Sequence, residues 1–208
     1  MYIVFEGIVG TGKSTLSSML LEHFKKELPD KEVILTREPG GGEIAEAIRT
    51  LVQATQFNEE MHAITTMYLY AASRAQTIQK IVKPVLKRNG IVISDRSFIT
   101  SLAYQGFGEG LGLEEVLEAN RQVIDNTWPD VVLYGDLAPE IALKRTRDRD
   151  GDRWETRSTY FFEKVRKGYE EVMKHELFKD KIFKYEIDND PDVSFDRILT
   201  ILKNKDLI

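Results

Sequence analysis

Residues 7–14 of this chain read GIVGTGKS, and this stretch decides the fold. It matches every fixed place of the GxxxxGK[ST] phosphate-binding loop. An apolar run over residues 2–5 comes before the loop and is typical of a buried strand. After the loop, apolar side chains recur at helical spacing, at Leu16, Met19, Leu20 and Phe24. A strand, a glycine loop and a helix in this order predict a P-loop rather than a glycine-rich turn with a chance lysine.

The residue types in the loop predict its chemistry. Its glycines let successive backbone N–H groups converge on phosphate oxygens. Lys13 should reach the β- and γ-phosphates of a nucleotide, and the Ser14 hydroxyl should bind Mg²⁺. A helix that begins at Lys13 directs its positive dipole end at the same anion. We therefore expect the chain to bind a nucleoside triphosphate together with Mg²⁺.

Composition limits the class of protein. The chain of 208 residues is long enough for one well-packed domain, so we expect a single domain over residues 1–208. Its net charge of −5 argues against a general nucleic-acid binder. It contains no cysteine, which excludes disulfides and thiolate metal sites. No apolar run is long enough for a membrane span. We expect a cytoplasmic protein whose partners are small-molecule nucleotides, not nucleic acids or membranes.

Short apolar runs alternate with helical patterns along the whole chain, which predicts a parallel sheet with crossover helices. The expected class is α/β, a three-layer P-loop NTPase fold with about five strands. In such sheets ligands bind beyond the carboxyl ends of the strands. The expected strands are Tyr2–Glu6, Val33–Thr36, Ile91–Ser94, Val131–Tyr134 and Ile182–Ile187.

Charged residues follow the third expected strand directly. Asp95 could hold Mg²⁺ as the second half of the metal site begun by Ser14. Arg96 offers a planar fork of donors for a phosphate. An internal ion pair between Asp95 and Arg96 is the alternative. Because a phosphate loop is present, we favour the functional interpretation.

Two further clusters are ambiguous on their own. The loop at residues 37–42 contains Pro39 and three glycines, and could form either a pocket wall or a plain turn. Tyr70 and Arg74 lie four residues apart on one helical face and could stack on and hydrogen-bond a nucleobase. On these two residues alone the favoured interpretation places Tyr70 in the core and Arg74 on the surface.

Two segments interrupt the regular pattern. Residues 106–112 contain four glycines, which predicts an exposed loop. Residues 144–157 are dense in arginine and acidic residues, and on charge pattern alone this favours a solvated, flexible loop. In a phosphate-transfer enzyme the same composition suits a mobile arginine lid, over about residues 145–158.

Taken in order, the motifs resemble those of bacterial thymidylate kinases, P-loop enzymes that phosphorylate dTMP to dTDP with ATP. The resemblance covers nearly the whole chain, and REPGG together with AYQG is far more specific than the loop alone. The segments that carry it are FEGIVGTGKST at 5–15, TREPGG at 36–41, YAASR at 70–74, DR at 95–96, SLAYQG at 101–106, WPDVVLY at 128–134, LKR at 143–145 and DR at 152–153.

The resemblance implies an acceptor site. Tyr70 stands where the family usually has a phenylalanine that stacks on thymine, while Arg74 and Gln105 would bond the base, with Ser101 nearby. Tyr104 would lie against the deoxyribose. The remaining implied acceptor residues are Arg96, with Arg49 as a second candidate, for the phosphate, and Glu38 and Pro39 for the pocket wall.

The resemblance also implies an ATP site and a catalytic set. Thr11 is not an arginine, which is typical of the family variant whose lid supplies the catalytic arginine, here Arg149 or Arg153. Lys13 and Arg96 would act with it, and Asp95 and Ser14 would organise Mg²⁺. The implied ATP-binding residues are Gly7, Gly10, Thr11, Gly12, Lys13, Ser14, Thr15 and, near adenine, Arg145. The family resemblance further implies a homodimer.

Two residues depart from the family pattern. Val9 stands where the family usually has an acidic residue that bonds the sugar 3′-hydroxyl, and Ser97 stands where an aromatic residue or histidine is usual. These departures leave alternatives open: a kinase for another (deoxy)nucleoside monophosphate, a deoxynucleoside kinase with Glu38 recruited as base, or a non-catalytic P-loop regulatory protein.

Overall fold

A five-stranded parallel sheet forms the centre of the computed structural model, which describes residues 1–146, 154, 157–205 and 207–208. The strand order is β2-β3-β1-β4-β5, so β1 lies in the middle with β3 and β4 beside it. The predicted fold class is confirmed, and each strand ends within two residues of its predicted end. The strands are β1 (Tyr2–Glu6), β2 (Val33–Arg37), β3 (Ile91–Asp95), β4 (Val131–Asp136) and β5 (Ile182–Glu186).

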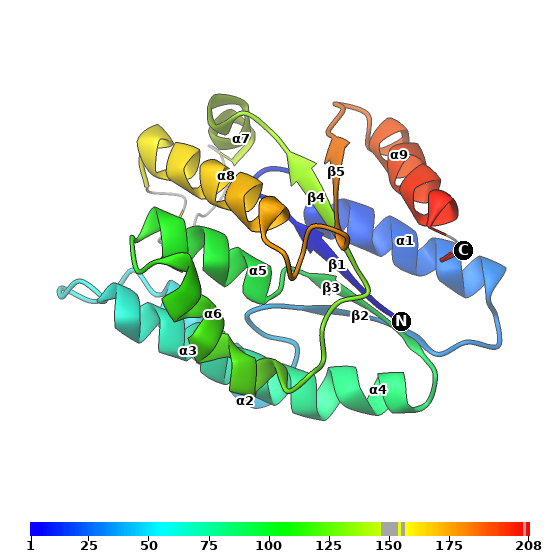
Figure 1. Ribbon diagram of the computed structural model, residues 1–208, viewed down its shortest axis with the longest axis horizontal. Helices are drawn as coiled ribbons and strands as arrows, with labels where there is room; N and C mark the ends of the chain where they lie inside the picture. The colour runs from blue at the N-terminus through cyan, green and yellow to red at the C-terminus, as the bar shows by residue number, and fades with distance from the viewer. Residues whose placement is uncertain (147–153, 155–156, 206) are drawn as a thin grey trace.

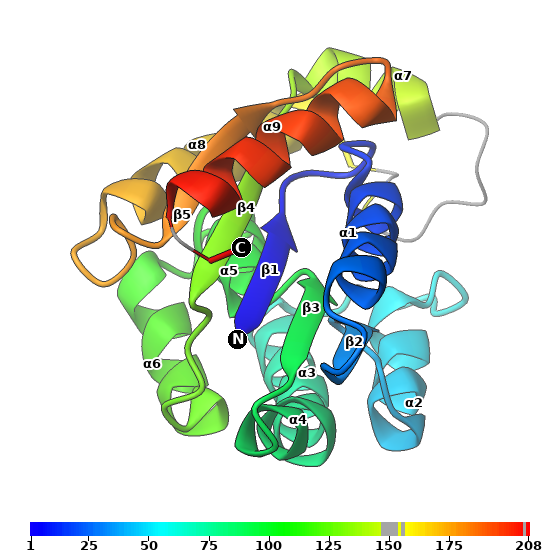
Figure 2. The same ribbon diagram turned by 90° about the vertical axis from the view of Figure 1, so that its right-hand side faces the viewer.

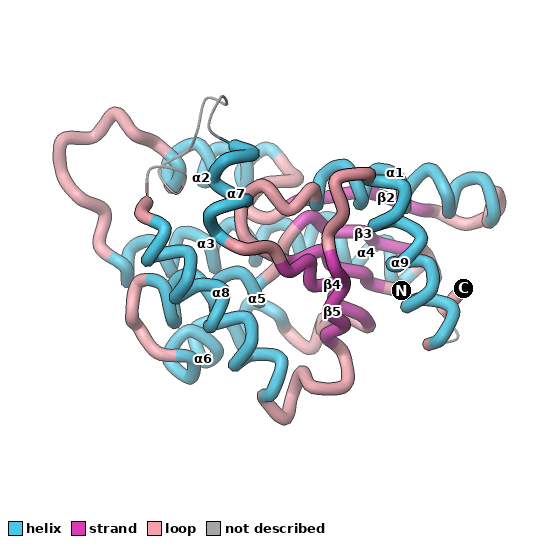
Figure 3. The backbone as a smooth tube through the Cα atoms, turned by 90° about the horizontal axis from the view of Figure 1, so that it is seen from above, coloured by secondary structure: helices cyan, strands magenta, loops and turns pink. Residues whose placement is uncertain are grey.

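Helices cover both faces of the sheet (Figure 1). One face carries α1 (Lys13–Glu27) and α9 (Pro191–Asn204), and Figure 3 shows the strands between this pair and the other helices. The other face carries α3 (Ala63–Thr77), α5 (Phe98–Ser101), α6 (Leu113–Ile124) and α8 (Thr159–Lys174). The remaining helical elements are α2 (Glu43–Gln53), the π-helical η1 (Ile78–Val82), α4 (Lys83–Lys87), the π-helical η2 (Leu102–Gly108) and α7 (Pro139–Thr146).

The alternation of side chains along β1 divides the core into two layers. Ile3 and Phe5 face α1 and α9, whereas Tyr2 and Val4 face the opposite helices. Both sets are buried, because a parallel sheet with helices on each face leaves neither side of a central strand in water. This explains why residues 2–5 of β1 form an unbroken apolar run.

The parallel strands bring the loops that follow them to one edge of the sheet. Phe5 is in register with Asp95 on β3, and Glu6 is in register with Tyr134 on β4. The loop after β1 therefore starts beside Asp95. From β1 the chain crosses to β2 on one side of the sheet, and from β3 it later crosses to β4 on the other side (Figure 2). In open parallel sheets, ligands bind beyond the carboxyl ends of the strands, at the point where the strand order reverses in this way.

The prediction of an exposed loop at residues 106–112 is wrong for its first half. Residues up to Gly108 belong to η2, and Gly106 and Gly108 are buried. A Cβ on Gly108 would lie 2.8 Å from Cε2 of Phe161 in α8. A Cβ on Gly168 of α8 would in turn lie 2.8 Å from Cβ of Phe107. These glycines allow η2 and α8 to pack closely, a role that local composition does not reveal.

Across the described residues, no helix is both long and apolar enough to cross a membrane.

Candidate active site

The phosphate-binding loop joins β1 to α1, as predicted. Gly10 and Gly12 have φ values of 73° and 77°, a left-handed conformation that favours glycine. Lys13 is the first residue of α1, and its Nζ donates to the Ile8 carbonyl at 2.7 Å and to Thr11 Oγ1 at 2.9 Å. The ammonium group is therefore held against the loop itself.

The Lys13 side chain is buried, and this changes its proton affinity. Burial, followed by repulsion from the Arg96 guanidinium, lowers the pKa of Lys13 from 10.5 to about 7, although Asp95 and Glu6 oppose the shift. A bound polyphosphate would add negative charge next to this ammonium group. The loop is therefore built to receive an anion.

Ser14 and Asp95, the two predicted metal ligands, are in contact. Ser14 Oγ donates to Asp95 Oδ2 at 2.5 Å. The other carboxylate oxygen, Asp95 Oδ1, is buried and has no hydrogen-bond partner among the described residues. The described part of the chain contains no group of three or more His, Cys, Asp or Glu side chains that could hold a metal ion. A hydroxyl and a single carboxylate are a donor set that fits Mg²⁺, which usually completes its shell with water and nucleotide phosphates.

Arg96 turns toward the phosphate loop and does not pair with Asp95. Its Nη1 donates to the Gly7 carbonyl at 2.9 Å, and its guanidinium lies 5.5 Å from the centroid of the Tyr104 ring. The residue has φ 78°, which is uncommon for a side chain with a Cβ. The cation thus stands between the loop and the predicted acceptor residues.

Glu38 and Arg74 form a buried ion pair. Arg74 is 2% exposed, so the interpretation that placed it on the surface is wrong. Its Nε donates to Glu38 Oε2 at 2.6 Å, its Nη2 donates to Ser101 Oγ at 3.0 Å and to the Ser97 carbonyl, and its Nη1 donates to Asn120 Oδ1. These contacts use four of the five guanidinium N–H groups, which leaves one on Nη1 for a ligand.

Tyr70 faces the same cavity and contacts a residue that the sequence analysis missed. Its hydroxyl accepts a hydrogen bond from Trp154 Nε1 at 2.7 Å. The indole ring stacks on Phe161 with the ring centroids 5.6 Å apart and meets Tyr104 edge-to-face at 5.4 Å. Trp154 is only 4% exposed. It lies in a densely charged segment, where nothing in the residue pattern indicates a buried aromatic side chain.

The amide of Gln105 is oriented by a carboxylate. Gln105 Nε2 donates to Glu109 Oε2 at 3.2 Å. Because a carboxylate only accepts, the amide nitrogen must face Glu109 and the oxygen must face away from it. Gln105 Oε1 is buried and has no partner among the described residues. The site therefore presents a guanidinium donor at Arg74 and an amide acceptor at Gln105.

Two more predicted residues mark opposite ends of the site. Arg49 Nη1 donates to the Pro39 carbonyl at 2.8 Å, which places it beside the buried Glu38 loop. Arg145, at the end of α7, donates through Nη2 to Asn189 Oδ1 at 2.8 Å. Arg149 and Arg153, the predicted lid arginines, lie outside the described residues, and their roles stay predictions.

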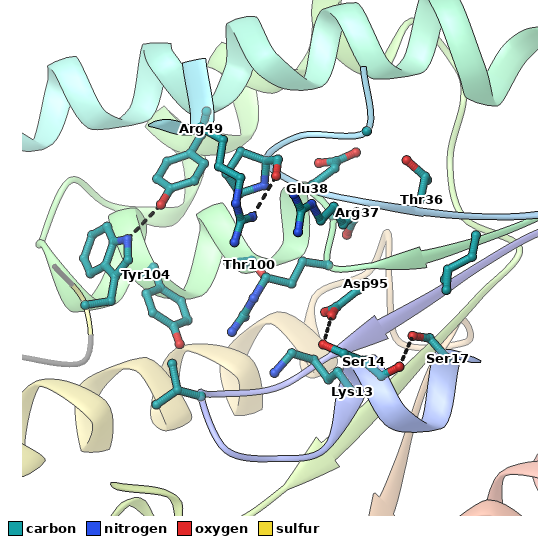
Figure 4. Close-up of a pocket in the computed structure, with 18 of the residues that line it drawn as sticks. Lys13, Ser14, Ser17, Thr36, Arg37, Glu38, Arg49, Asp95, Thr100 and Tyr104 are labelled. Atoms are coloured by element: carbon teal, nitrogen blue, oxygen red, sulfur yellow. Dashed lines mark hydrogen bonds between the residues drawn. The ribbon is translucent and has the colours of Figure 1, made fainter. Parts of the chain in front are cut away.

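One cavity of about 970 Å³ joins these parts. Figure 4 shows Lys13, Arg49 and Tyr104 pointing into it from different elements. Among the predicted residues, Gly7 and the fully buried Thr11 do not line it. The predicted residues that line it are Gly10, Gly12, Lys13, Ser14, Thr15, Glu38, Pro39, Arg49, Tyr70, Arg74, Asp95, Arg96, Ser101, Tyr104, Gln105 and Arg145.

Comparison with known proteins agrees with this geometry. The family model described as thymidylate kinase matches residues 5–187. Thymidylate kinase of Finegoldia magna is 44% identical over 85% of this chain and 86% of its own length, and that of Bacillus cytotoxicus is 36% identical over 99% and 98%. The crystal structure of thymidylate kinase from Ehrlichia chaffeensis superposes with a TM-score of 0.77 at 28% identity, covering 98% of both chains.

The resemblance inferred from the sequence motifs is thereby confirmed. The family model covers the phosphate loop, the acceptor-side residues Arg74 and Arg96, and the strand β5. This chain belongs to the thymidylate kinase family.

Proposed function

We propose that the protein transfers the γ-phosphoryl group of ATP to dTMP, giving dTDP and ADP. The observation that carries this proposal is the single cavity of about 970 Å³, which is lined at once by the phosphate loop and by the buried Arg74, Tyr70 and Gln105. A nucleotide-dependent regulatory protein needs the loop but has no use for a second, base-sized polar pocket. Two nucleotides that meet at their phosphates account for both halves of the cavity.

The polarity of the acceptor half favours thymine or uracil. These bases present carbonyl oxygens and an N3–H group on their pairing edge, which match the Arg74 donor and the Gln105 Oε1 acceptor. Cytosine would present a ring acceptor where the N3–H stands. A site that leaves buried polar groups unpaired with the wrong ligand discriminates strongly against it.

The phosphate half supplies charge and needs no strong general base. The acceptor is a phosphate oxygen that is already anionic, so the enzyme must position it in line and neutralise the developing charge. Lys13 and Arg96 would supply the positive charge that neutralises it. Arg149 or Arg153, which lie outside the described residues, would add an arginine from the lid. Arg145, beside Asn189, would lie near the adenine of ATP.

Ser14 and Asp95 would hold the Mg²⁺ of the ATP complex. When bound, the ion would neutralise charge on the β- and γ-phosphates of the donor. The contact between Ser14 Oγ and Asp95 Oδ2 places both oxygen ligands within reach of one ion. We expect Asp95→Asn to weaken Mg²⁺-dependent ATP binding more than Mg²⁺-free ADP binding, as measured by titration calorimetry.

An acceptor screen tests the proposal. Mg²⁺–ATP-dependent ADP formation is measured with dTMP, dUMP, dCMP, dGMP, AMP and thymidine offered separately. We expect turnover to be fastest with dTMP. Turnover mainly with another acceptor would keep the mechanism and overturn the substrate, and turnover with thymidine alone would favour a deoxynucleoside kinase. ATP hydrolysis that no acceptor stimulates would favour the regulatory protein.

The deoxynucleoside kinase alternative requires a carboxylate that is available as a base. Glu38 is the candidate, and burial raises the pKa of its carboxyl, against the opposing effect of Arg74. However, Glu38 Oε2 already accepts from Arg74 Nε at 2.6 Å, so proton abstraction would have to compete with this ion pair. We therefore keep the nucleotide as the proposed acceptor.

Val9 suggests looser recognition of the sugar. It lines the cavity with an apolar side chain and cannot hydrogen-bond a 3′-hydroxyl. We expect 3′-deoxy-dTMP to be phosphorylated with a kcat/KM within about tenfold of dTMP, since the loss of one neutral hydrogen bond costs about 1 kcal/mol. A loss of kcat/KM greater than about a hundredfold would mean that another residue reads the 3′-hydroxyl.

The acceptor phosphate is assigned to Arg96, and Arg96→Ala tests this. We expect kcat/KM for dTMP to fall by about a thousandfold, because a charge-assisted contact to the reacting phosphate is lost. ATP affinity should change little. Unchanged turnover would remove Arg96 from the site.

The family's homodimer and a cytoplasmic location complete the proposal. Ile64 and Tyr68 lie four residues apart on α3 and are 57% and 60% exposed, which supports a self-association surface. Met67 and Leu69, by contrast, pack in or against the core. The cytoplasmic location rests on the chemistry of ATP and dTMP, which are intracellular nucleotides.

A further inference from the structure

A buried carboxylate lies beside the proposed site without touching the cavity. Glu6 ends β1 and is 0% exposed. Its Oε1 accepts from the Ser97 backbone N–H and hydroxyl, both at 2.8 Å. Its Oε2 accepts from Thr100 Oγ1 at 2.5 Å and from the Tyr169 hydroxyl at 2.9 Å. Because an ionised carboxylate only accepts, all four groups must donate to it, and their orientations are fixed.

Two of the residues that donate to Glu6, Ser97 and Thr100, closely follow the strained residue Arg96 in the chain. A left-handed backbone at a residue with a Cβ costs about 1–2 kcal/mol, and it persists only where its surroundings hold it. The Arg96 N–H donates to the Phe5 carbonyl at 2.9 Å, and the Arg96 carbonyl accepts from Ser94 Oγ at 2.7 Å. The next peptide N–H, that of Ser97, donates to Glu6. Glu6 therefore anchors the chain immediately after the strained residue.

The side chain of Arg96 is tied to the same network. Thr100 Oγ1 has one hydrogen, which it donates to Glu6, so its lone pairs face Arg96 Nη1 at 3.4 Å. The Tyr169 hydroxyl, from α8, also approaches the Gly7 carbonyl to which Arg96 donates. β1, α5 and α8 thus meet at one carboxylate next to the arginine.

Glu6 also carries a negative charge close to two cations of the site. Lys13 and Arg96 are two cations close enough to repel one another, and Glu6 attracts both. Burial raises the pKa of Glu6, while Thr100, Arg96, Ser97 and Tyr169 oppose the shift. The donors around it are those that an ionised carboxylate requires.

We propose that Glu6 is a positioning residue that, through Ser97 and Thr100, holds Arg96 in the left-handed conformation in which its guanidinium faces the acceptor phosphate. The inference rests on the proposed function, since it takes Arg96 as the phosphate ligand. It also gives Ser97 a role, because its hydroxyl donates to the Glu6 carboxylate at 2.8 Å, which a phenylalanine at this position could not do.

Glu6→Gln is the first variant. It keeps the size of the side chain but turns one acceptor oxygen into a donor that faces groups already donating. We expect kcat/KM for dTMP to fall by about a hundredfold, as for a displaced catalytic group, with KM for ATP within about twofold of wild type. Glu186→Gln, an exposed glutamate at the end of β5, is the matched control and should keep wild-type values.

A double-mutant cycle separates positioning from general stability. The dissociation constant for dTMP is measured by titration calorimetry for wild type, Glu6→Gln, Arg96→Ala and the double variant. We expect Glu6→Gln to weaken dTMP binding about tenfold when Arg96 is present, but less than about twofold when Arg96 is replaced by alanine. An equal loss in both backgrounds would overturn the proposal, because Glu6 would then act on the fold and not through Arg96.

Thr100→Val covers the case in which Glu6→Gln does not fold. It removes only the hydroxyl between Glu6 and Arg96, and we expect kcat/KM for dTMP to fall about tenfold in a protein that binds ATP normally. Wild-type turnover in this variant would contradict the proposal that Glu6 positions Arg96 through Thr100. If wild type itself does not phosphorylate dTMP, the proposed function fails. If wild type and Arg96→Ala behave as proposed but Glu6→Gln does not, only this inference fails.

Discussion

At the scale of single residues, the site depends on charges taken out of water. Glu38 and Arg74 are 4% and 2% exposed, so each must be compensated by the other. Lys13 is likewise buried, and its hydrogen-bond partners among the described residues are two neutral oxygen atoms. Such groups contribute to ligand recognition at a cost in stability, and that cost can be measured.

Arg74→Met should destabilise the protein by about 3–5 kcal/mol at pH 7, because it leaves Glu38 buried without its partner. Glu38 would then titrate above its unfolded pKa, so the folded state would bind the extra proton and the loss should be smaller at pH 5 than at pH 7. Urea denaturation at both pH values measures it. Arg37→Met removes the exposed pair with Glu46 and should cost about 1 kcal/mol or less. Similar losses for both variants would contradict the prediction.

Lys13 should make stability rise with pH. Its pKa is about 7 in the folded protein and 10.5 is its ordinary value, so between these values the unfolded state binds more protons. The free energy of unfolding of the nucleotide-free protein should therefore increase across this window. Lys13→Met should lack this increase relative to wild type in urea titrations from pH 7 to pH 10. Lys26→Met, at an exposed position of the same helix, should keep the wild-type pH profile, and identical profiles for wild type and Lys13→Met would rule out the effect.

At the scale of elements, η2 and α8 are joined by glycine contacts. Gly168 sits inside α8, where alanine would normally stabilise a helix by about 1 kcal/mol. Its hydrogen, however, faces Phe107 at a distance that leaves no room for a methyl group. Composition alone predicted an exposed loop for the glycines of residues 106–112, whereas packing between two distant segments determines the role of Gly108 and Gly168.

Gly168→Ala should therefore destabilise the protein, by about 1–3 kcal/mol, despite its higher helix propensity. Thermal unfolding followed by circular dichroism measures the change. Lys167→Ala on the exposed face of the same helix should be within about 0.5 kcal/mol of wild type. A stabilised Gly168→Ala protein would show that α8 can move away from η2 without a loss of stability.

At the scale of the whole molecule, the sheet topology brings distant parts of the chain into one cavity. The phosphate loop, the Glu38 loop, α3, η2 and α7 each contribute to its lining. The exposed apolar residues of α3 lie outside that cavity, so association through them would leave the site open.

The double variant Ile64→Glu/Tyr68→Glu should convert a dimer to monomers, because two charges would be buried in an apolar contact. Sedimentation velocity at micromolar concentration measures the state. Tyr160→Glu changes a tyrosine that is 68% exposed on α8 and should leave the oligomeric state unchanged. A double variant that sediments as wild type would remove this face of α3 from the interface.

The sequence by itself determined the strands, the phosphate loop and most residues that line the cavity. These features are local: apolar periodicity sets an element, and a P-loop needs a fixed spacing of glycine, lysine and serine. Tertiary structure alone decided that Arg74 is buried against Glu38, that Trp154 enters the cavity and that Glu6 contacts Ser97, Thr100 and Tyr169. The physical reason is that these contacts join residues between 36 and 163 positions apart, in which neither partner carries a local sign of the other.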